Sequence, residues 1–147
     1  MSPRRLPPGF RLAARRVPVA DYLRLRRAVG WTELDPGTAA RGLAGALFAV
    51  VLEKDGAVVG CGQVVGDGAV YFYIQDVIVE ESHRGLGLGD AIMERLMAWV
   101  GERAGRGSFI GLMAARGVAG FYERLGFDRR DPEAPGMCRY WRGEEAP

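Results

Sequence analysis

Alternate glycines at a strand-to-helix junction constrain this chain more than any other feature. The segment Arg84-Gly-Leu-Gly-Leu-Gly89 follows an apolar run that ends at Val79. It opens a stretch, 88–100, in which apolar residues recur every four positions, and this period predicts a helix. Glycine lets the backbone approach a ligand closely, and a helix N-terminus presents free N–H groups and partial positive charge. The segment therefore predicts a turn that binds a phosphate or pyrophosphate.

The spacing of these glycines disfavours the common nucleotide-binding motifs. A GxGxxG fingerprint would need its third glycine where the chain has Asp90 or Ile92. A Walker A loop needs a lysine in the turn, and the turn contains none. ATP, GTP and NAD are therefore not the expected ligands.

The rest of the chain predicts an α/β protein with a mixed, mostly antiparallel sheet. The expected strands cover 10–17, 47–52, 57–65, 69–79 and 109–113, with a last strand within 137–141. The expected helices cover 21–29 and 36–46, the second with Asp35 as its N-cap. A long helix is expected from Leu88 to just before Gly105, and a short one over 118–125. Asp55-Gly56 and Asp67-Gly68 predict two tight hairpin turns. A strand, the long helix and the next strand form a crossover, which predicts one parallel strand pair.

Length and composition limit the class of protein. With 147 residues the chain suits one domain over 1–147. No uncharged stretch approaches the ~20 residues that a membrane helix needs, and no apolar leader follows the first residues, so neither a membrane span nor a secretory signal is expected. Two distant cysteines and one histidine give no metal site and no disulfide framework, so the expected location is the cytoplasm.

Positive charge is concentrated at the start of the chain. Residues 1–30 contain eight arginines and one aspartate, whereas the remainder is net negative. Because leucine and valine interrupt these arginines, a solvated helix face is favoured over a nucleic-acid surface, and no nucleic-acid partner is expected.

Two motifs together resemble a known family. Arg-Gly-x-Gly-x-Gly after a strand is similar to the acetyl-CoA signature of the GNAT superfamily of N-acetyltransferases. Phe121-Tyr-Glu-Arg-Leu-Gly-Phe127 resembles its second signature, commonly FYxxxGF. The resemblance covers roughly 47–142. Within the superfamily, the Ile-Gln-Asp-Val strand is most similar to plant- and cyanobacterial-type aralkylamine N-acetyltransferases.

The resemblance implies a single GNAT domain that uses acetyl-CoA and no metal. The strands at 70–79 and 109–113 would splay apart and admit the pantetheine arm. An amine would attack the thioester directly, and the expected partner is a small-molecule primary amine. The implied cofactor-binding residues are Val77, Ile78, Val79, Arg84, Gly85, Leu86, Gly87, Leu88 and Gly89.

The resemblance also implies two catalytic residues. Tyr122 would lie beside the CoA sulfur as general acid, although its spacing alone equally suits a core tyrosine. Asp76 is the candidate general base, with a structural acceptor as the alternative, because Gln75 stands where some relatives have glutamate. His83 is expected to be a solvated turn residue, and Arg116 to contact CoA, the acceptor or solvent.

The acceptor and the assembly state stay open. Trp31, with Glu33 and Asp35 nearby, could receive a cationic arylalkylamine. The alternatives are acetylation of a protein N-terminus or lysine, a non-catalytic acyl-CoA-binding module, and a nucleic-acid-binding regulator. A homodimer is compatible with the sequence.

Overall fold

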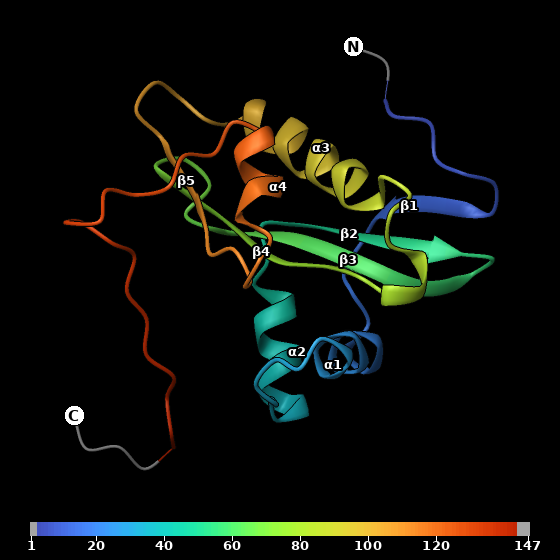
Figure 1. Cartoon of the computed structure of the whole chain (residues 1–147). Coiled ribbons are helices and arrows are strands. Elements are labelled where there is room, and N and C mark those ends of the chain that lie inside the picture. The colour runs from blue at the N-terminus through green and yellow to red at the C-terminus, as the bar shows by residue number, and fades with distance from the viewer. Residues whose placement is uncertain (1–2, 144–147) are drawn as a thin grey trace. The chain divides into compact units, whose positions relative to one another are not determined.

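Residues 3–143 are described by a computed structural model (Figure 1). They form two compact units, of which the sheet unit ends at Leu112 and the C-terminal unit starts at Met113. Among the described residues, no helix is long and apolar enough to cross a membrane.

The sheet unit contains all of the strands that the structure describes. In chain order its elements are β1 (Phe10–Ala14), α1 (Val19–Ala28), α2 (Pro36–Ala44), β2 (Phe48–Lys54), β3 (Ala57–Gly66), β4 (Tyr71–Val79), the short 3-10 helix η1 (Glu81–His83), α3 (Leu88–Gly101) and β5 (Phe109–Leu112). The C-terminal unit contains α4 (Ala119–Arg124).

The sheet has the order β1-β2-β3-β4-β5. Each neighbouring pair is antiparallel except β4 and β5, which are parallel because α3 forms the crossover between them. The predicted fold class, α/β with a mixed and mostly antiparallel sheet, is confirmed.

Helices cover both faces of this sheet. Figure 1 shows α1 and α2 on one face and α3 on the other. On the first face a buried cluster joins the helices to the strands; it consists of Val17, Tyr22, Leu25, Ala39, Leu43, Val51, Val58, Cys61 and Ile78. On the second face α3 packs so tightly that a Cβ at Gly62 would lie 2.6 Å from Ile92. Packing on both faces therefore holds the strands, and the residues at their ends, in fixed positions.

Local signals placed several turns and caps correctly. Asp55 and Gly56 adopt φ values of +50° and +87°, as a tight primed turn requires. Asp35 caps α2, because its carboxylate accepts a hydrogen bond from the Thr38 backbone N–H at 3.0 Å.

The second hairpin turn differs from its prediction. The connection from β3 to β4 covers four residues, 67–70, rather than two. Asp67 does not have a positive φ. Instead, its Oδ1 accepts hydrogen bonds from the N–H groups of Ala69, Val70 and Tyr71. The side chain, not a left-handed backbone pair, organises this turn.

Two predicted boundaries and one predicted strand also need correction. β1 ends at Ala14 rather than at Val17, and α3 ends at Gly101 rather than just before Gly105. The last strand predicted within 137–141 is wrong, because these residues lie outside any strand. A strand needs a neighbour that completes its hydrogen-bond ladder, and the described sheet ends at β5.

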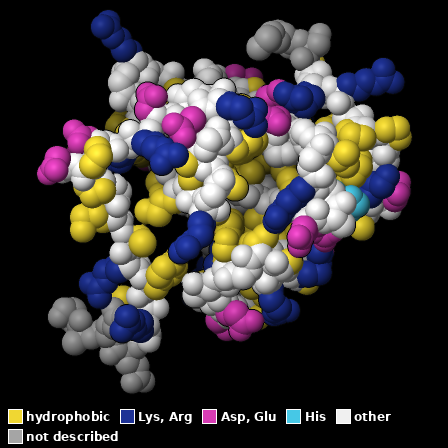
Figure 2. Space-filling view, viewed as in Figure 1, with side chains coloured by type: hydrophobic (Ala, Val, Ile, Leu, Met, Phe, Trp, Pro, Cys, Tyr) yellow, Lys and Arg dark blue, Asp and Glu magenta, His cyan; other side chains and the backbone are white. Residues whose placement is uncertain are grey.

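The early arginines bind carboxylates from other parts of the sheet unit. The ion pairs are Arg4–Glu94, Arg15–Glu53, Arg24–Glu80, Arg26–Asp76 and Arg27–Glu33. The charge asymmetry of the sequence is thus partly neutralised within the fold. Figure 2 shows acidic and basic side chains interspersed on the viewed face.

Candidate active site

The sheet opens where β5 stops. Residues 71–74 of β4 pair with Phe109–Leu112 of β5, and the last register pair is Ile74 with Leu112. β4 continues to Val79, so 75–79 extend beyond the end of β5. This leaves one edge of β4 without a β5 partner, at the position where the resemblance implies splayed strands.

A β-bulge lies at the start of this open edge. Gln75 pairs with Gln63, but the next pair is Ile78 with Cys61, so β4 uses one residue more than β3. Asp76 takes up the difference with φ +55°, a left-handed conformation that few residues other than glycine adopt. Outliers of this kind concentrate at functional sites.

The Asp76 side chain is buried in a polar network. Its Oδ2 accepts hydrogen bonds from the Tyr22 hydroxyl at 2.8 Å and from Gln63 Nε2 at 2.7 Å. Its Oδ1 accepts one from Arg26 Nη1 at 3.2 Å, which is also an ion pair. Three side chains from α1 and β3 therefore fix the carboxylate of Asp76, the candidate general base.

Burial controls the protonation of two neighbours of Asp76. Desolvation, reinforced by the Asp76 charge, raises the pKa of Tyr22 well above its ordinary value. The same two causes raise the pKa of the Cys61 thiol, which donates to the Asp76 carbonyl oxygen at 3.2 Å. Tyr22 therefore stays a hydrogen-bond donor at neutral pH, and Cys61 stays a protonated thiol rather than a nucleophile.

The backbone beyond the bulge directs donors to the open edge. The Glu80 N–H bonds to Val59 in β3 at 2.9 Å, and successive N–H groups in an extended strand point to opposite edges. The N–H groups of Val77 and Val79 therefore face away from β3, whereas that of Ile78 faces toward it. Of the three β4 residues implied in cofactor binding, two can donate to a ligand at this edge.

The glycine turn connects this edge to α3. Gly85 and Gly87 have φ values of +82° and +74°, and Gly87 is the N-cap of α3. Gly89 lies inside the helix and does not have a positive φ. Leu86 is half exposed, whereas the Leu88 side chain belongs to the core and only its backbone can face a ligand.

Two arginines flank the turn. Arg84 Nε donates to the Val79 carbonyl at 3.2 Å, which ties the turn back to the end of β4. Arg4 Nη1 lies 3.5 Å from the place that a Cβ at Gly87 would occupy, and Arg4 pairs with Glu94 of α3. Sequence reasoning missed Arg4, because no local pattern connects position 4 with position 87.

Tyr122 lies on α4 in the C-terminal unit. Its ring makes edge-to-face contacts with Phe121 and Phe127, at centroid distances of 4.9 and 6.2 Å. The helix closes through Gly126, with φ +94°, and a bond from the Phe127 N–H to the Tyr122 carbonyl. Burial raises the pKa of Tyr122, so its hydroxyl stays protonated at neutral pH.

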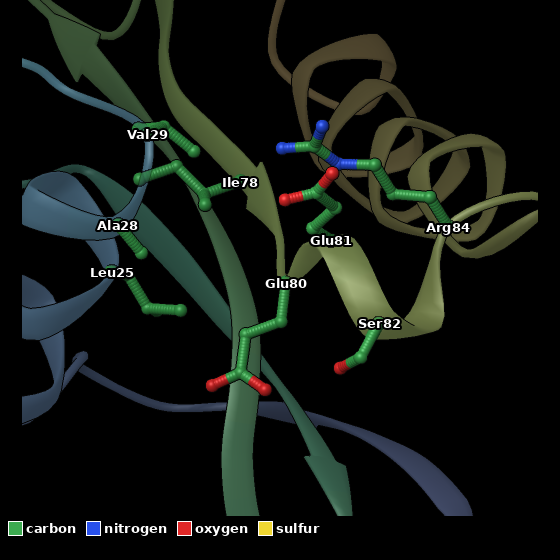
Figure 3. Close-up of a pocket in the computed structure, with 8 residues that line it drawn as sticks. All are labelled: Leu25, Ala28, Val29, Ile78, Glu80, Glu81, Ser82 and Arg84. Carbon is green, nitrogen blue, oxygen red and sulfur yellow. The ribbon is translucent and has the colours of Figure 1, made fainter.

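A pocket of about 490 Å³ adjoins the end of β4. Apolar side chains of α1, of its C-cap and of β4 form one side of it: Leu25, Ala28, Val29 and Ile78. Glu80, Glu81, Ser82 and Arg84 form the other. Figure 3 shows the Glu81 and Arg84 side chains converging opposite the apolar group. We call this the β4-end pocket.

The pocket around Trp31 has a different character. It measures about 260 Å³, and both Arg26 and Arg27 line it. The Arg26 guanidinium lies 5.6 Å from the Trp31 ring centroid, and Glu33 already pairs with Arg27. Because Asp35 is occupied as the cap of α2, the acidic groups expected to attract an amine here are engaged. Glu80 of the β4-end pocket is engaged as well, by Arg24, so that pocket is the better acceptor candidate through its larger volume and its apolar side.

His83 lines neither of these two pockets. His83 is not fully solvated, since its ring makes an edge-to-face contact with Phe10 at 5.3 Å. Within 3–143, no group of three or more His, Cys, Asp or Glu side chains could hold a metal ion.

A strand with an open edge, followed by a glycine turn at the N-terminus of a crossover helix, is the arrangement that the resemblance to the GNAT superfamily implies. The family model described as an acetyltransferase (GNAT) domain matches residues 45–129. The chain belongs to this family, as its two motifs predicted.

Similarity to individual proteins agrees with this assignment. The chain is 48% identical over 80 residues to serotonin N-acetyltransferase 2, chloroplastic, of Oryza sativa subsp. japonica. That match covers 53% of this chain and 38% of the rice protein, so the chain spans well under half of that relative. The similarity to plant aralkylamine-type enzymes is thus also found.

Solved structures share the fold over most of the chain. A probable acetyltransferase from Staphylococcus aureus has TM-score 0.85 and 29% identity, with 90% of this chain and 99% of that one covered. A GNAT family protein from Streptococcus pneumoniae has TM-score 0.76 and 26% identity, with 90% and 98% covered.

Proposed function

We propose that this protein transfers the acetyl group of acetyl-CoA to a small primary amine. The open edge of β4 that leads into the glycine turn is the observation that carries the proposal. It offers the N–H groups of Val77 and Val79 for the pantetheine arm and thioester, and the turn at Gly85 and Gly87 for the pyrophosphate. A Cβ at Gly85 would meet nothing within 4 Å, so the turn has room for a ligand.

The residues of this chain would assist a direct attack. The amine nitrogen forms a bond to the thioester carbonyl carbon, and the C–S bond then breaks and releases CoA as a thiolate. A backbone N–H at the open edge would stabilise the negative charge on the carbonyl oxygen. Tyr122 would donate its hydroxyl proton to the departing sulfur, and its raised pKa keeps that proton available.

Asp76 is the proposed acceptor of the proton that the amine loses. Its carboxylate already accepts from Tyr22, Gln63 and Arg26, so it would have to release a donor to act as a base. The pH–rate profile of Asp76→Asn separates the two roles. Loss of a base removes the acidic limb of the profile, whereas loss of positioning lowers the rate equally at every pH.

An amine with an apolar body and a cationic head is the substrate class we propose. The β4-end pocket supports it with an apolar side and, opposite, two lining glutamates, of which Glu80 also pairs with Arg24. The rice relative, named a serotonin N-acetyltransferase, supports the same class.

We also propose a cytoplasmic location, which the free thiols of Cys61 and Cys138 support. A homodimer is proposed as well, and the exposed apolar side chains of Val70, Tyr71 and Phe109 support it.

A thiol-release assay with acetyl-CoA tests the proposal. The amines compared are tryptamine, a polyamine, an amino sugar and a short peptide, with mass spectrometry of each product. We expect tryptamine to exceed the amino sugar in kcat/KM at least ~10-fold, since burying its aromatic ring contributes more than the 1.4 kcal/mol that a tenfold ratio requires. A preference for the peptide would instead favour a protein acetyltransferase. Acetyl-CoA binding without turnover of any amine would favour a non-catalytic binding module.

A further inference from the structure

Arg26 contacts several separate parts of the site region. Its Nη1 reaches Asp76 at the β4 bulge, and its Nη2 donates to the Thr32 carbonyl at 2.8 Å. Its guanidinium also lies over the rings of Tyr22 and Trp31, at 5.5 and 5.6 Å from their centroids. One guanidinium thus bridges the bulge, helix α1 and residues 29–35, which we call the α1–α2 loop.

The bridge depends on the shape of arginine and not only on its charge. A guanidinium is a planar fork that donates in several fixed directions, and it stacks on aromatic rings. Lysine has a compact point charge, which could satisfy the carboxylate or the carbonyl but would not hold both in this geometry. The side chains of Arg26 and Asp76 are only 14% and 8% exposed, so water competes weakly for these contacts.

Stability alone explains this network poorly. Arg26 Nε and Gln63 Oε1 are buried, and neither has a hydrogen-bond partner among the described residues. Unpaired buried polar atoms are costly, and a buried ion pair is often no more stable than an apolar replacement. A gain in stability therefore does not explain why the network combines a left-handed Asp76, an ion pair and two unpaired atoms.

We infer that Arg26 is a positioning residue for the acetyl-transfer site. By bridging Asp76 and the Thr32 carbonyl, it fixes the bulge and the α1–α2 loop as one unit. The bulge sets the direction of the Val77 N–H, which faces the open edge of β4. The inference rests on the proposed function, because it gives Arg26 its effect through the alignment of amine and thioester.

The test compares Arg26→Met and Arg26→Lys with the matched control Arg27→Met. Arg27 is the next residue on the same helix and pairs with Glu33 in the α1–α2 loop, but its side chain is 70% exposed. The measurements are kcat and KM for tryptamine, the acetyl-CoA Kd by calorimetry, and amide hydrogen exchange of the unliganded proteins.

We expect kcat/KM of Arg26→Met to fall at least tenfold while the acetyl-CoA Kd stays within threefold, because the glycine turn is untouched. Hydrogen exchange should accelerate together at 76–78 and at 30–35. Arg26→Lys should recover thermal stability through its charge, yet keep the reduced kcat/KM. Arg27→Met should match the wild type in all three measurements.

A double variant and a second measurement keep the test decisive if Arg26→Met folds poorly or no amine is acetylated. Should Arg26→Met fold poorly because Asp76 is left as an unpaired buried charge, the double variant Arg26→Met/Asp76→Asn removes that charge and serves in the exchange experiment. If no amine is acetylated by the wild type, the proposed function fails, and hydrogen exchange still tests the bridge. Full activity of Arg26→Lys, or faster exchange in only one of the two segments, would overturn the inference.

Discussion

The bulge of β4 and the glycine turn before α3 are adjacent in the chain but built in opposite ways. Side chains hold the bulge: Asp76 is buried and receives hydrogen bonds from Tyr22, Arg26 and Gln63. Backbone conformation makes the turn, where Gly85 and Gly87 adopt positive φ and Gly85 has open space around it.

This difference separates two tasks of the proposed site. A turn of free N–H groups can bind a flexible, highly charged pyrophosphate with little need for exact placement. The reacting thioester needs a rigid neighbour, because small errors in alignment cost large factors in rate. We therefore expect substitutions at the bulge to change stability and kcat, and substitutions at the turn to change cofactor affinity.

The largest effect is expected at the bulge. Asp76→Asn keeps a residue that tolerates positive φ but removes the charge that pairs with Arg26. Breaking a buried ion pair in this way should cost about 3 kcal/mol of unfolding free energy. Urea denaturation measures this loss, with Asp128→Asn, in the exposed part of the C-terminal unit, as the control. A loss below ~0.5 kcal/mol would mean that side chains do not hold the bulge.

The next largest effect is expected at Tyr122. The FYxxxGF motif predicts its role as general acid. Tyr122→Phe keeps the ring packing against Phe121 and Phe127 and removes only the hydroxyl. We expect kcat to fall ~10²-fold, within the usual range for a general acid. Steady-state kinetics check the rate, while thermal stability and acetyl-CoA affinity should stay near wild type. A kcat within twofold of wild type would make Tyr122 a packing residue.

At the turn, Gly87→Val should act on affinity. Valine is strongly disfavoured at φ +74°, and its side chain would cover the N–H groups at the start of α3. The acetyl-CoA Kd should rise at least tenfold, or about 1.4 kcal/mol. Calorimetry compares it with Gly105→Val, where the added Cβ meets nothing within 4 Å and φ is not positive. Equal affinities of the two variants would place the pyrophosphate elsewhere.

The smallest effect is expected at Asp67, whose side chain organises the turn at the opposite end of β4. Backbone N–H groups of Tyr71, Ala69 and Val70 hold the pKa of Asp67 below its ordinary value. A depressed folded-state pKa stabilises the protein above the ordinary value and loses that contribution as the pH falls. The Tm advantage of wild type over Asp67→Asn should therefore be present near pH 7 and shrink below about pH 4. A pH-independent difference would contradict this account.

The contrast also explains what the sequence could predict. The glycine turn, the Asp55-Gly56 hairpin and the Asp35 cap depend on residues close together in the chain, so local patterns reveal them. The second hairpin was mispredicted because a two-residue pattern ignores how far the Asp67 carboxylate reaches.

Long-range contacts were beyond local patterns. The Tyr22 hydroxyl meets Asp76 across 54 positions, and Arg4 reaches α3 across 90. No periodicity in the sequence links such pairs, which form only when the fold brings α1 against β4 and the N-terminal segment against α3. For the same reason, the apolar residues within 137–141 predicted a strand without showing whether a neighbouring strand would exist.

Hydrogen exchange with and without acetyl-CoA tests the central claim most directly, because the open edge and the turn are both defined by backbone N–H groups. We predict that acetyl-CoA slows exchange at Val77 and Val79 and across 85–89, and leaves Ile78, whose N–H faces β3, nearly unchanged. Binding of acetyl-CoA with protection confined to other segments would contradict the account.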